Sequence, residues 1–311
     1  MKESRKDIIS MRDLSKEEIL HILDTARYLE ENPQAELMKG RVVSTLFFEP
    51  STRTRLSFWS AAQRLGAQVL GFDSPDGTSA KKGESLTDTI RMASSYSDII
   101  VMRHPNDGAA RLASEVSKVP ILNAGDGSNQ HPSQTLLDLY TIQKKFGSLD
   151  GKKIAFVGDL KYGRTVHSLA KALTHFGAIM YFVAPESLQM PEYICDDLEK
   201  SGIEYYKVED YREILDKIDI FYMTRIQRER FPDDEEYEKV KGIYIINKES
   251  IIGKCKEEMI ILHPLPRVNE IDVDLDNTPH AMYFEQAANG VPTRQALLAL
   301  SLGLVKKLGD E

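Results

Sequence analysis

The segment FEPSTRTRLSF, residues 48–58, gathers hydroxyl and guanidinium groups into a single turn. An apolar run ends at Phe48, Pro50 stops it, and either Ser51 or Thr52 is a preferred residue for beginning a helix. The unpaired N–H groups of a helix N-terminus carry partial positive charge, so hydroxyls and a guanidinium beside them complete a phosphate cradle. The candidate phosphate-binding residues are Ser51, Thr52, Arg53 and Thr54.

The same turn also has a purely structural interpretation, namely an ordinary helix cap with surface arginines. Arg55 in particular suits a structural ion pair with a carboxylate such as Glu49. Two hydroxyls and an arginine at the end of a strand favour the functional interpretation, because ligands of parallel sheets bind beyond the carboxyl ends of the strands. We therefore expect a small phosphorylated substrate at this turn, whose acyl-type group is passed to an amino acid.

Two further strand ends carry groups that are suited to polarising a carbonyl. Arg103 follows an apolar run in MRHP, and His131 opens a helical pattern in GDGSNQHPSQ, with Gln134 in its first turn. A lone histidine is usually structural. One at a helix start, beside an amide and near other strand-end loops, is a candidate for stabilising developing negative charge. Spacing alone does not decide between these two interpretations of His131.

The second half of the chain places arginines after two more apolar runs. Arg164 follows one of them, and Arg225 and Gln227 follow another. Bidentate arginine contacts suit carboxylates, so this pattern indicates a dicarboxylate co-substrate. The turn VGDLKYGRT lacks GxGxxG, which argues against a nicotinamide site. In HPLPR two prolines fix a loop that exposes the carbonyl of Leu265, although such a loop is also typical of a stiff structural turn.

Short apolar runs alternate with amphipathic stretches along the chain, which is typical of parallel sheets covered by helices on both faces. The predicted strands are residues 41–48, 68–72, 98–103, 119–123, 153–158, 179–184, 218–224 and 259–263. The predicted helices are residues 52–65, 85–96, 109–117, 133–146, 163–176, 192–201 and 292–308.

The order of these elements predicts an α/β protein with two doubly wound parallel-sheet domains in tandem, joined by helices. Four strands precede residue 133 and four follow residue 152. We expect one domain over residues 1–132 and the second over residues 133–289. The segment 290–311 is expected to pack back onto the first domain, because it follows the last strand and has no strand of its own.

Composition excludes several classes of protein. A chain of 311 residues with 41% hydrophobic and 28% charged residues is typical of a globular protein of two-domain size. The net charge of −8 disfavours nucleic acid or an anionic membrane as the partner. No long apolar run or leader is present, so we expect no membrane span and a cytoplasmic protein. Cys195 and Cys255 lack metal or disulfide spacing, and the acidic run 233–238 predicts a solvated loop or a helix start.

Long motifs, in order and over nearly the whole chain, resemble the catalytic chain of the aspartate carbamoyltransferase family. They are FEPSTRTRLSF, MRHP, NAGDGSNQHPSQTLLDL, VGDLKYGRTVHS, MTRIQRER and HPLPRVNEI. The resemblance implies transfer of the carbamoyl group of carbamoyl phosphate to L-aspartate, giving N-carbamoyl-L-aspartate and phosphate in pyrimidine biosynthesis. It implies a carbamoyl phosphate domain and an aspartate domain, no metal or cofactor, and a homotrimer with active sites at subunit boundaries. A zinc-containing regulatory chain is a further partner that the sequence neither requires nor excludes.

The resemblance also implies a role for each matching residue. The phosphate is held by Ser51, Thr52, Arg53 and Thr54. The carbonyl is polarised by Arg103 and His131, with Thr54 near its oxygen, and the carbamoyl amide is bound by Gln134. The aspartate carboxylates are bound by Arg164, Arg225 and Gln227, and the carbonyls of Leu265 and Pro266 accept amine protons. The neighbouring subunit's site is reached by Ser79 and Lys82, both of which bind carbamoyl phosphate there, and Lys82 also binds aspartate.

Two positions depart from the common family pattern. The spacing in GTSAKKGES leaves open whether Lys81 or Lys82 enters the neighbouring site, and without the resemblance this segment is a flexible lysine loop. Trp59 stands where many relatives have an acidic residue, about a helical turn past the phosphate turn.

Three alternatives to aspartate carbamoylation remain at this point. Ornithine carbamoyltransferase shares the phosphate turn and the fold, but HPLPR in place of HCLP and the dicarboxylate arginines favour aspartate. A catalytically silent scaffold subunit is disfavoured because the catalytic positions are intact. A nicotinamide oxidoreductase is disfavoured by the missing glycine motif.

Overall fold

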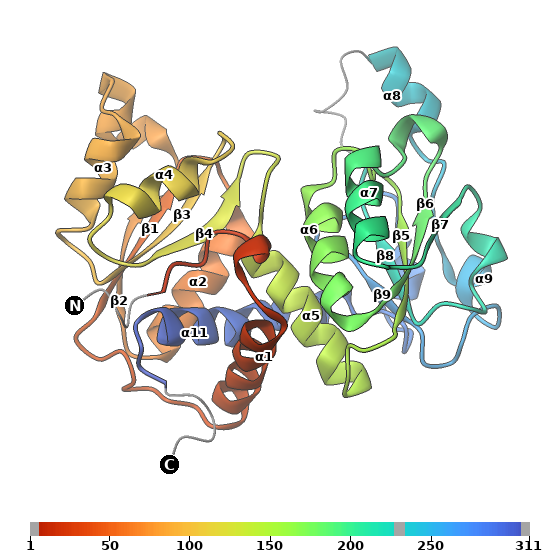
Figure 1. The fold of residues 1–311 in the computed structure, drawn as a ribbon, viewed down its shortest axis with the longest axis horizontal. Helices are drawn as coiled ribbons and strands as arrows, with labels where there is room; N and C mark the ends of the chain where they lie inside the picture. The colour runs from red at the N-terminus through yellow and green to blue at the C-terminus, as the bar shows by residue number, and fades with distance from the viewer. Residues whose placement is uncertain (1–5, 227–233, 306–311) are drawn as a thin grey trace. The chain divides into compact units, whose positions relative to one another are not determined.

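The structure is a computed structural model, and it describes residues 6–226 and 234–305 (Figure 1). The chain divides into two compact units. The first runs to Tyr140 and resumes at Ala288, and the second comprises Thr141–Ala287. The division falls within helix α5 (Pro132–Phe146), so this helix contributes to both units.

A parallel sheet of four strands, in the order β2-β1-β3-β4, forms the centre of the first unit. Its strands are β1 (Val42–Phe47), β2 (Gln68–Phe72), β3 (Ile99–His104) and β4 (Ile121–Asp126). Its helices are α1 (Lys16–Glu31), α2 (Thr52–Arg64), α3 (Leu86–Ala93), α4 (Ala109–Val116) and α11 (Gly290–Ser301).

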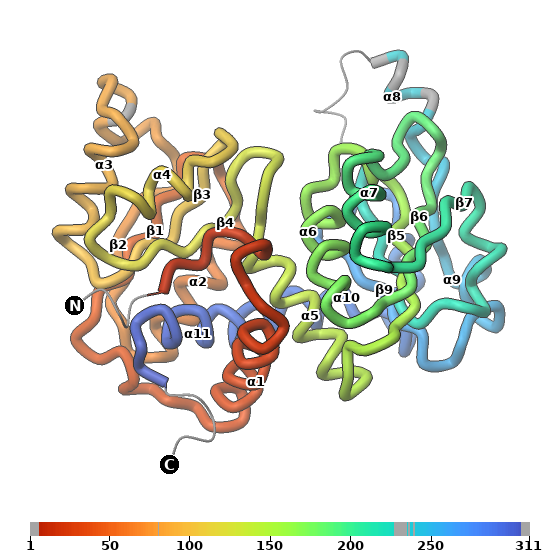
Figure 2. The backbone as a smooth tube through the Cα atoms, viewed as in Figure 1, coloured from red at the N-terminus to blue at the C-terminus, as the bar shows by residue number. Residues whose placement is uncertain are grey.

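The central strands β1 and β3 are mostly buried, which explains why they are rich in apolar residues, whereas the edge strand β2 is partly exposed. Side chains alternate along β3, so that Ile100 and Met102 pack in the same core as Ile90 of α3 and Ala110 of α4. The C-terminal helix α11 is buried on most sides. It packs against both α1 and α2, beside which it lies in Figure 2. Helix α1 begins at Ser15 with a capping box, in which Ser15 and Glu18 bond each other's backbone N–H groups.

A second parallel sheet, in the order β7-β6-β5-β8-β9, forms the centre of the second unit. Its strands are β5 (Lys153–Val157), β6 (Ile179–Val183), β7 (Tyr205–Val208), β8 (Ile220–Met223) and β9 (Ile260–Leu262). The helices that follow these strands are α6 (Arg164–Leu173), α7 (Glu192–Lys200), α8 (Asp234–Val240), α9 (Lys248–Ile251) and α10 (Tyr283–Ala288).

The predicted fold class is confirmed, since both sheets are parallel and carry helices. The prediction of four strands in the second half was wrong, because the sheet there has five. The additional strand, β7, has only four residues at the edge of the sheet, and two of them, Tyr206 and Lys207, are exposed. Such a short and partly polar strand lacks the apolar run by which the others were predicted. Helix α1 was also not predicted.

Candidate active site

The phosphate turn lies where β1 ends and α2 begins. Ser51 is the N-cap residue of α2, with extended backbone, and its side chain makes no capping hydrogen bond. The first intrahelical bond at this end runs from the N–H of Arg55 to the carbonyl of Ser51, at 3.1 Å. The N–H groups of the first helical residues therefore have no partner within the helix. Thr54, which is buried, is the third residue of the helix, so its hydroxyl and these N–H groups belong to the same first turn, which has the geometry of an anion site.

Arg103 lies beside this turn because β1 and β3 are neighbours in the sheet, with Phe47 paired to Arg103. Its guanidinium makes an ion pair with Glu49 at 2.8 Å and donates to the carbonyl of Ala124 at 3.4 Å. Burial lowers the pKa of Arg103, Glu49 acts in the opposite direction, and the positive charge of Arg53 lowers the pKa further. Two guanidiniums close enough to repel one another define a site for a multiply charged anion.

Arg55 has a structural role, and its partner differs from the one that the sequence suggested. It pairs with Asp73 at 2.7 Å, whereas Glu49 pairs with Arg103. The Arg55 guanidinium also lies over the ring of Trp59, 5.1 Å from the ring centre. Trp59 in turn donates from Nε1 to the hydroxyl of Thr45 at 2.8 Å, which attaches α2 to β1.

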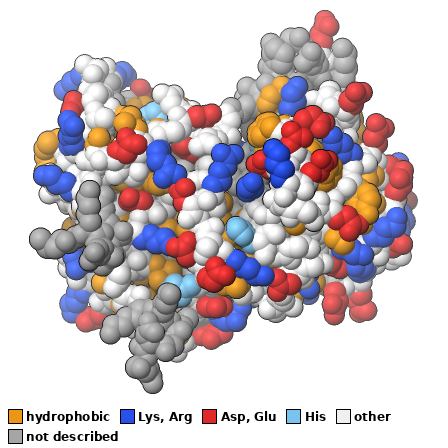
Figure 3. All heavy atoms as spheres, in the orientation of Figure 1, with side chains coloured by type: hydrophobic (Ala, Val, Ile, Leu, Met, Phe, Trp, Pro, Cys, Tyr) orange, Lys and Arg blue, Asp and Glu red, His pale blue; other side chains and the backbone are white. Residues whose placement is uncertain are grey.

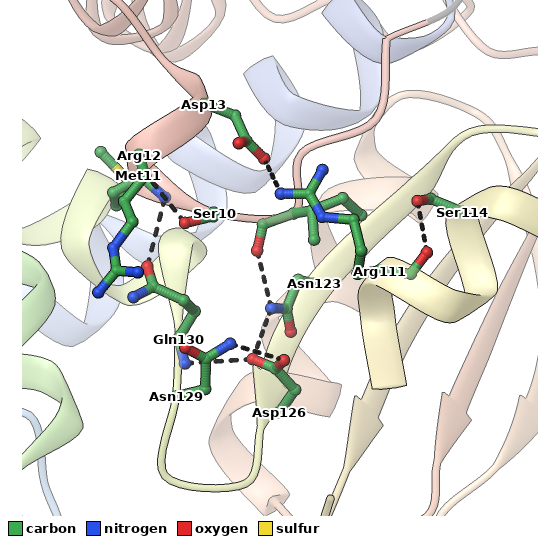
Figure 4. Close-up of polar contacts among 11 residues, drawn as sticks. Ser10, Met11, Arg12, Asp13, Arg111, Ser114, Asn123, Asp126, Asn129 and Gln130 are labelled. Carbon is green, nitrogen blue, oxygen red and sulfur yellow. Dashed lines mark hydrogen bonds and ion pairs between the residues drawn. The ribbon is translucent and has the colours of Figure 1, made fainter. Parts of the chain in front are cut away.

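The loop that precedes His131 is organised by the buried carboxylate of Asp126, as Figure 4 shows. Asp126 accepts hydrogen bonds from the side chains of Asn123 and Asn129, at 2.9 and 3.1 Å. It also accepts from the backbone N–H groups of Gln130, at 3.1 Å, and Gly108, at 2.9 Å. The role of this aspartate could not be predicted from the sequence, because its partners come from strand β4 and from two different loops.

His131 lies directly after this loop and is buried, with 5% of its surface exposed. Its carbonyl accepts from the N–H groups of Gln134 and Thr135, at 3.0 and 3.2 Å, so it begins helix α5. The hydroxyl of Ser133 lies 3.4 Å from Nδ1 of the ring. Gln134 is half-buried and donates from Nε2 to Asp138 at 2.9 Å.

Three strand ends thus meet at one edge of the first sheet, in the order β1, β3, β4. The order of strands reverses between β1 and β3, which is where open α/β sheets bind ligands. The phosphate turn and Arg103 stand at this position, and the His131 loop follows the next strand. The structure therefore brings together the predicted phosphate-binding residues and the two predicted carbonyl-polarising residues at one edge.

Ser79 and Lys82 lie apart from these loops in sequence, in a short 3₁₀ helix, Ser79–Lys82, and both are exposed. Lys81 pairs with Asp76 at 3.4 Å. Within residues 6–226 and 234–305, Lys82 makes no such ion pair, and both lysines are exposed.

In the second unit the ends of β5 and β8 are held in close contact. A side chain at Gly158 would place its Cβ 2.5 Å from the carbonyl oxygen of Thr224, and Gly158 has a positive φ of +115°. Only glycine suits this position. Arg164 begins helix α6 after β5, and Arg225 follows Thr224 after β8. Gln227, the third predicted residue of this group, lies outside the described residues.

A hollow in this unit lies at the same strand ends. It is lined by residues from the loops after β5, β8 and β9 and by residues in and just after helix α8: Gly158, Thr224, Arg225, Glu270, Tyr237 and Lys241. One of the two described arginines that were predicted to bind a dicarboxylate therefore faces a concave surface.

The loop after β9 holds Leu265 in a left-handed conformation, with φ of +57°. The ring of His263 fixes it: Nδ1 accepts the N–H of Leu265 at 2.8 Å, so Nε2 donates to Glu270 at 2.7 Å. Glu270 also accepts the N–H groups of Val268 and Asn269, at 3.0 and 3.1 Å. These buried groups, which sequence reasoning did not select, keep the backbone at Leu265 and Pro266 in one conformation.

Two family models together match most of the chain. Residues 6–144 match "Aspartate/ornithine carbamoyltransferase, carbamoyl-P binding domain", and residues 150–301 match "Aspartate/ornithine carbamoyltransferase, Asp/Orn binding domain". The chain belongs to the aspartate/ornithine carbamoyltransferase family.

Curated relatives and solved structures agree with this assignment. The chain is 56% identical over 304 residues to the aspartate carbamoyltransferase catalytic subunit of Thermococcus kodakarensis, covering 96% of this chain and 98% of that protein. The catalytic subunit of M. jannaschii aspartate transcarbamoylase matches with a TM-score of 0.89 and 55% identity, over 98% of this chain and 100% of the other. Aspartate transcarbamoylase from Trypanosoma cruzi in complex with carbamoyl phosphate and aspartate matches with a TM-score of 0.88 and 39% identity, over 95% and 96% of the two chains.

Basic and acidic side chains are intermingled over the face of the molecule in Figure 3.

Among the residues that the structure describes, none of the helices combines the length and the apolar character needed to cross a bilayer.

Proposed function

We propose that this chain transfers the carbamoyl group of carbamoyl phosphate to L-aspartate, giving N-carbamoyl-L-aspartate and phosphate in pyrimidine biosynthesis. The observation that carries the proposal is the phosphate turn, whose free N–H groups lie next to the buried guanidinium of Arg103 at the switch point of the first sheet. Relatives that are more than half identical over nearly the whole chain are aspartate carbamoyltransferase catalytic subunits, which supports the choice of aspartate.

The first unit binds carbamoyl phosphate in this proposal. The phosphate is held by Ser51, Thr52, Arg53 and Thr54, whose backbone and side chains surround the start of α2. Arg103 and His131 donate to the carbonyl oxygen, together with Thr54. Glu49 pairs with Nη2 of Arg103 at 2.8 Å and holds the guanidinium in place, while Nε, which is buried and has no partner among the described residues, is left to donate to the substrate.

The second unit binds aspartate. Arg164 and Arg225 bind its two carboxylates, with Gln227 as a further donor, because guanidinium forks match carboxylate geometry. The carbonyls of Leu265 and Pro266 accept hydrogen bonds from the N–H groups of the carbamoyl amide and of the aspartate amine. The His263 and Glu270 bonds keep the Leu265 carbonyl in a fixed position for this contact.

The reaction needs only that the two substrates are held in register. The aspartate nitrogen attacks the carbonyl carbon and forms the new C–N bond, and the C–O bond to phosphate breaks with its electron pair going to the phosphate. The departing phosphate accepts the amine proton. Arg103, His131 and Thr54 stabilise the negative charge that develops on the carbonyl oxygen in the transition state.

We further propose a homotrimer in which Ser79 and Lys82 act in the site of a neighbouring copy, and a cytoplasmic location. Mixing Arg53→Ala and Lys82→Ala chains tests the shared site. Each intact site needs Arg53 from one copy and Lys82 from the next, so random mixing restores about ½ × ½, or a quarter, of wild-type activity. Two parent variants that stay inactive after mixing would show that each chain contains a complete site.

The acceptor is tested by supplying carbamoyl phosphate with either aspartate or ornithine and identifying the carbamoylated product. Carbamoyl aspartate alone is expected. Carbamoyl ornithine, or no product with either amine, would overturn the assignment. The mass of the purified complex, measured with and without a zinc-containing regulatory chain, tests whether that chain is a partner.

A further inference from the structure

Asp138 is a buried carboxylate in contact with a proposed substrate-binding residue. It lies on α5 four residues after Gln134, so the two side chains are on the same face of the helix. Asp138 is fully buried, whereas Gln134 is half-buried. Gln134 donates from Nε2 to Oδ1 of Asp138 at 2.9 Å.

This contact fixes the orientation of the Gln134 amide. A carboxylate only accepts hydrogen bonds, so the NH₂ group of Gln134 must face Asp138. Its oxygen, Oε1, then points away from the carboxylate. An amide that is free to rotate would offer its NH₂ and its oxygen to a ligand in either orientation, and these two groups have opposite hydrogen-bonding character.

A buried cation from the C-terminal helix compensates the charge of Asp138. Arg294 of α11 is 3% exposed, and its guanidinium lies over the ring of Phe58 in α2, 5.0 Å from the ring centre. Gly290 makes room for it, because a Cβ there would lie 2.0 Å from Nη1 of Arg294. Burial lowers the pKa of Arg294 to about 10, against the opposing effect of the Asp138 charge, and at neutral pH the side chain is still a cation.

We propose that Asp138 is a positioning residue that turns Oε1 of Gln134 toward the substrate, so that the site selects a carbamoyl group, which bears NH₂, over an acetyl group of the same shape. This inference rests on the proposed function. Acetyl phosphate carries a methyl group where carbamoyl phosphate has its amide nitrogen, so it has no N–H group to donate to Oε1 of Gln134. A site built to accept a hydrogen bond rejects a ligand that lacks the donor.

Equilibrium binding tests the inference without any need for turnover. The fluorescence of Trp59, the single tryptophan, is followed while phosphate, acetyl phosphate or carbamoyl phosphate is added to the full chain. We expect the wild-type chain to bind carbamoyl phosphate about tenfold or more tightly than acetyl phosphate, as one hydrogen bond allows. Asp138→Asn is expected to remove most of this preference, because an amide at this position bonds to either orientation of Gln134. Phosphate affinity is expected to stay the same.

Two further variants keep the test decisive. Gln134→Met removes the acceptor without changing the buried charges, and it is expected to abolish the preference for carbamoyl phosphate. Asp138→Asn combined with Arg294→Met removes both buried charges together and serves if Asp138→Asn alone does not fold. Unchanged selectivity in Gln134→Met, or in a folded variant at Asp138, overturns the inference. Loss of phosphate binding along with selectivity also overturns it, because the role of Asp138 is then merely structural. A wild-type chain that fails to carbamoylate aspartate but keeps this selectivity contradicts the proposed function and leaves the role of Asp138 supported.

Discussion

Replacement of Arg103 by alanine removes one donor to the carbonyl oxygen while leaving the phosphate turn in place. The Arg103 side chain is 12% exposed and its charge lies in a largely water-free environment, where a donor stabilises developing charge much more than in water. Loss of one such donor costs about 10²–10³ in turnover, or about 2.7–4 kcal/mol in the barrier.

The fold is expected to tolerate the change. The Glu49 carboxylate that loses its partner is 32% exposed, so water solvates it in part, and the free energy of unfolding falls by about 1–3 kcal/mol. The variant is therefore expected to stay folded at assay temperature, and rate and stability are measured separately.

Initial rates at saturating substrates and a thermal unfolding curve measure the two effects. Arg55→Ala is the matched control, because Arg55 lies in the same turn but pairs with Asp73 and stacks on Trp59. It is expected to retain turnover close to that of the wild type. Normal turnover in Arg103→Ala removes Arg103 from the catalytic role. An equal loss in both variants shows instead that arginines in this region act only by maintaining the turn.

Three other changes have defined outcomes. Trp59→Phe is expected to abolish the fluorescence response to carbamoyl phosphate and to leave turnover unchanged. A response that persists in this variant would show that Trp59 is not the source of the signal. Arg225→Ala should raise KM for aspartate roughly 10–100-fold, since a charge-assisted hydrogen bond is lost, with carbamoyl phosphate affinity unchanged in binding titrations. For Glu270, burial alone raises the pKa, but the bonds from His263 and the backbone outweigh it and hold the pKa below 4.5. The ionised Glu270 carboxylate therefore stabilises the fold fully above pH 4.5, and this stabilisation is lost as the pH falls further. Glu270→Gln should make the free energy of unfolding fall less steeply as the pH is lowered. Equal slopes for the variant and the wild type would contradict this.

Most strands of the two sheets could be predicted from the sequence, because burial gives them a recognisable composition. Strands β1, β3 and β8 are mostly buried, so they are rich in apolar residues, and each is followed by a loop with polar or basic residues. Strand β7 was missed because it is short, lies at an edge and is half exposed. Helix α1 was not predicted, although Ser15 and Glu18 form a capping box that marks its start.

The groups that orient the site were the part that sequence reasoning could not find. Asp126 and Glu270 lie within long motifs, but their roles could not be predicted, because each role depends on backbone N–H groups that only the folded loop brings together. Asp138 had a local signal, its spacing of four residues from Gln134 in a helical pattern. Its buried counterpart, Arg294, comes from the other end of the chain, and no local pattern predicts such a contact.

The fate of the atoms in one turnover tests the central claim most directly. Carbamoyl phosphate labelled with ¹³C in the carbonyl and ¹⁸O in the bridging oxygen is supplied with aspartate, and the products are weighed by mass spectrometry. Attack of the amine on the carbonyl carbon predicts ¹³C in carbamoyl aspartate and ¹⁸O in the released phosphate, in equal amounts. Phosphate that carries no ¹⁸O, with the label left on the carbon fragment, would mean attack at phosphorus and contradict the account.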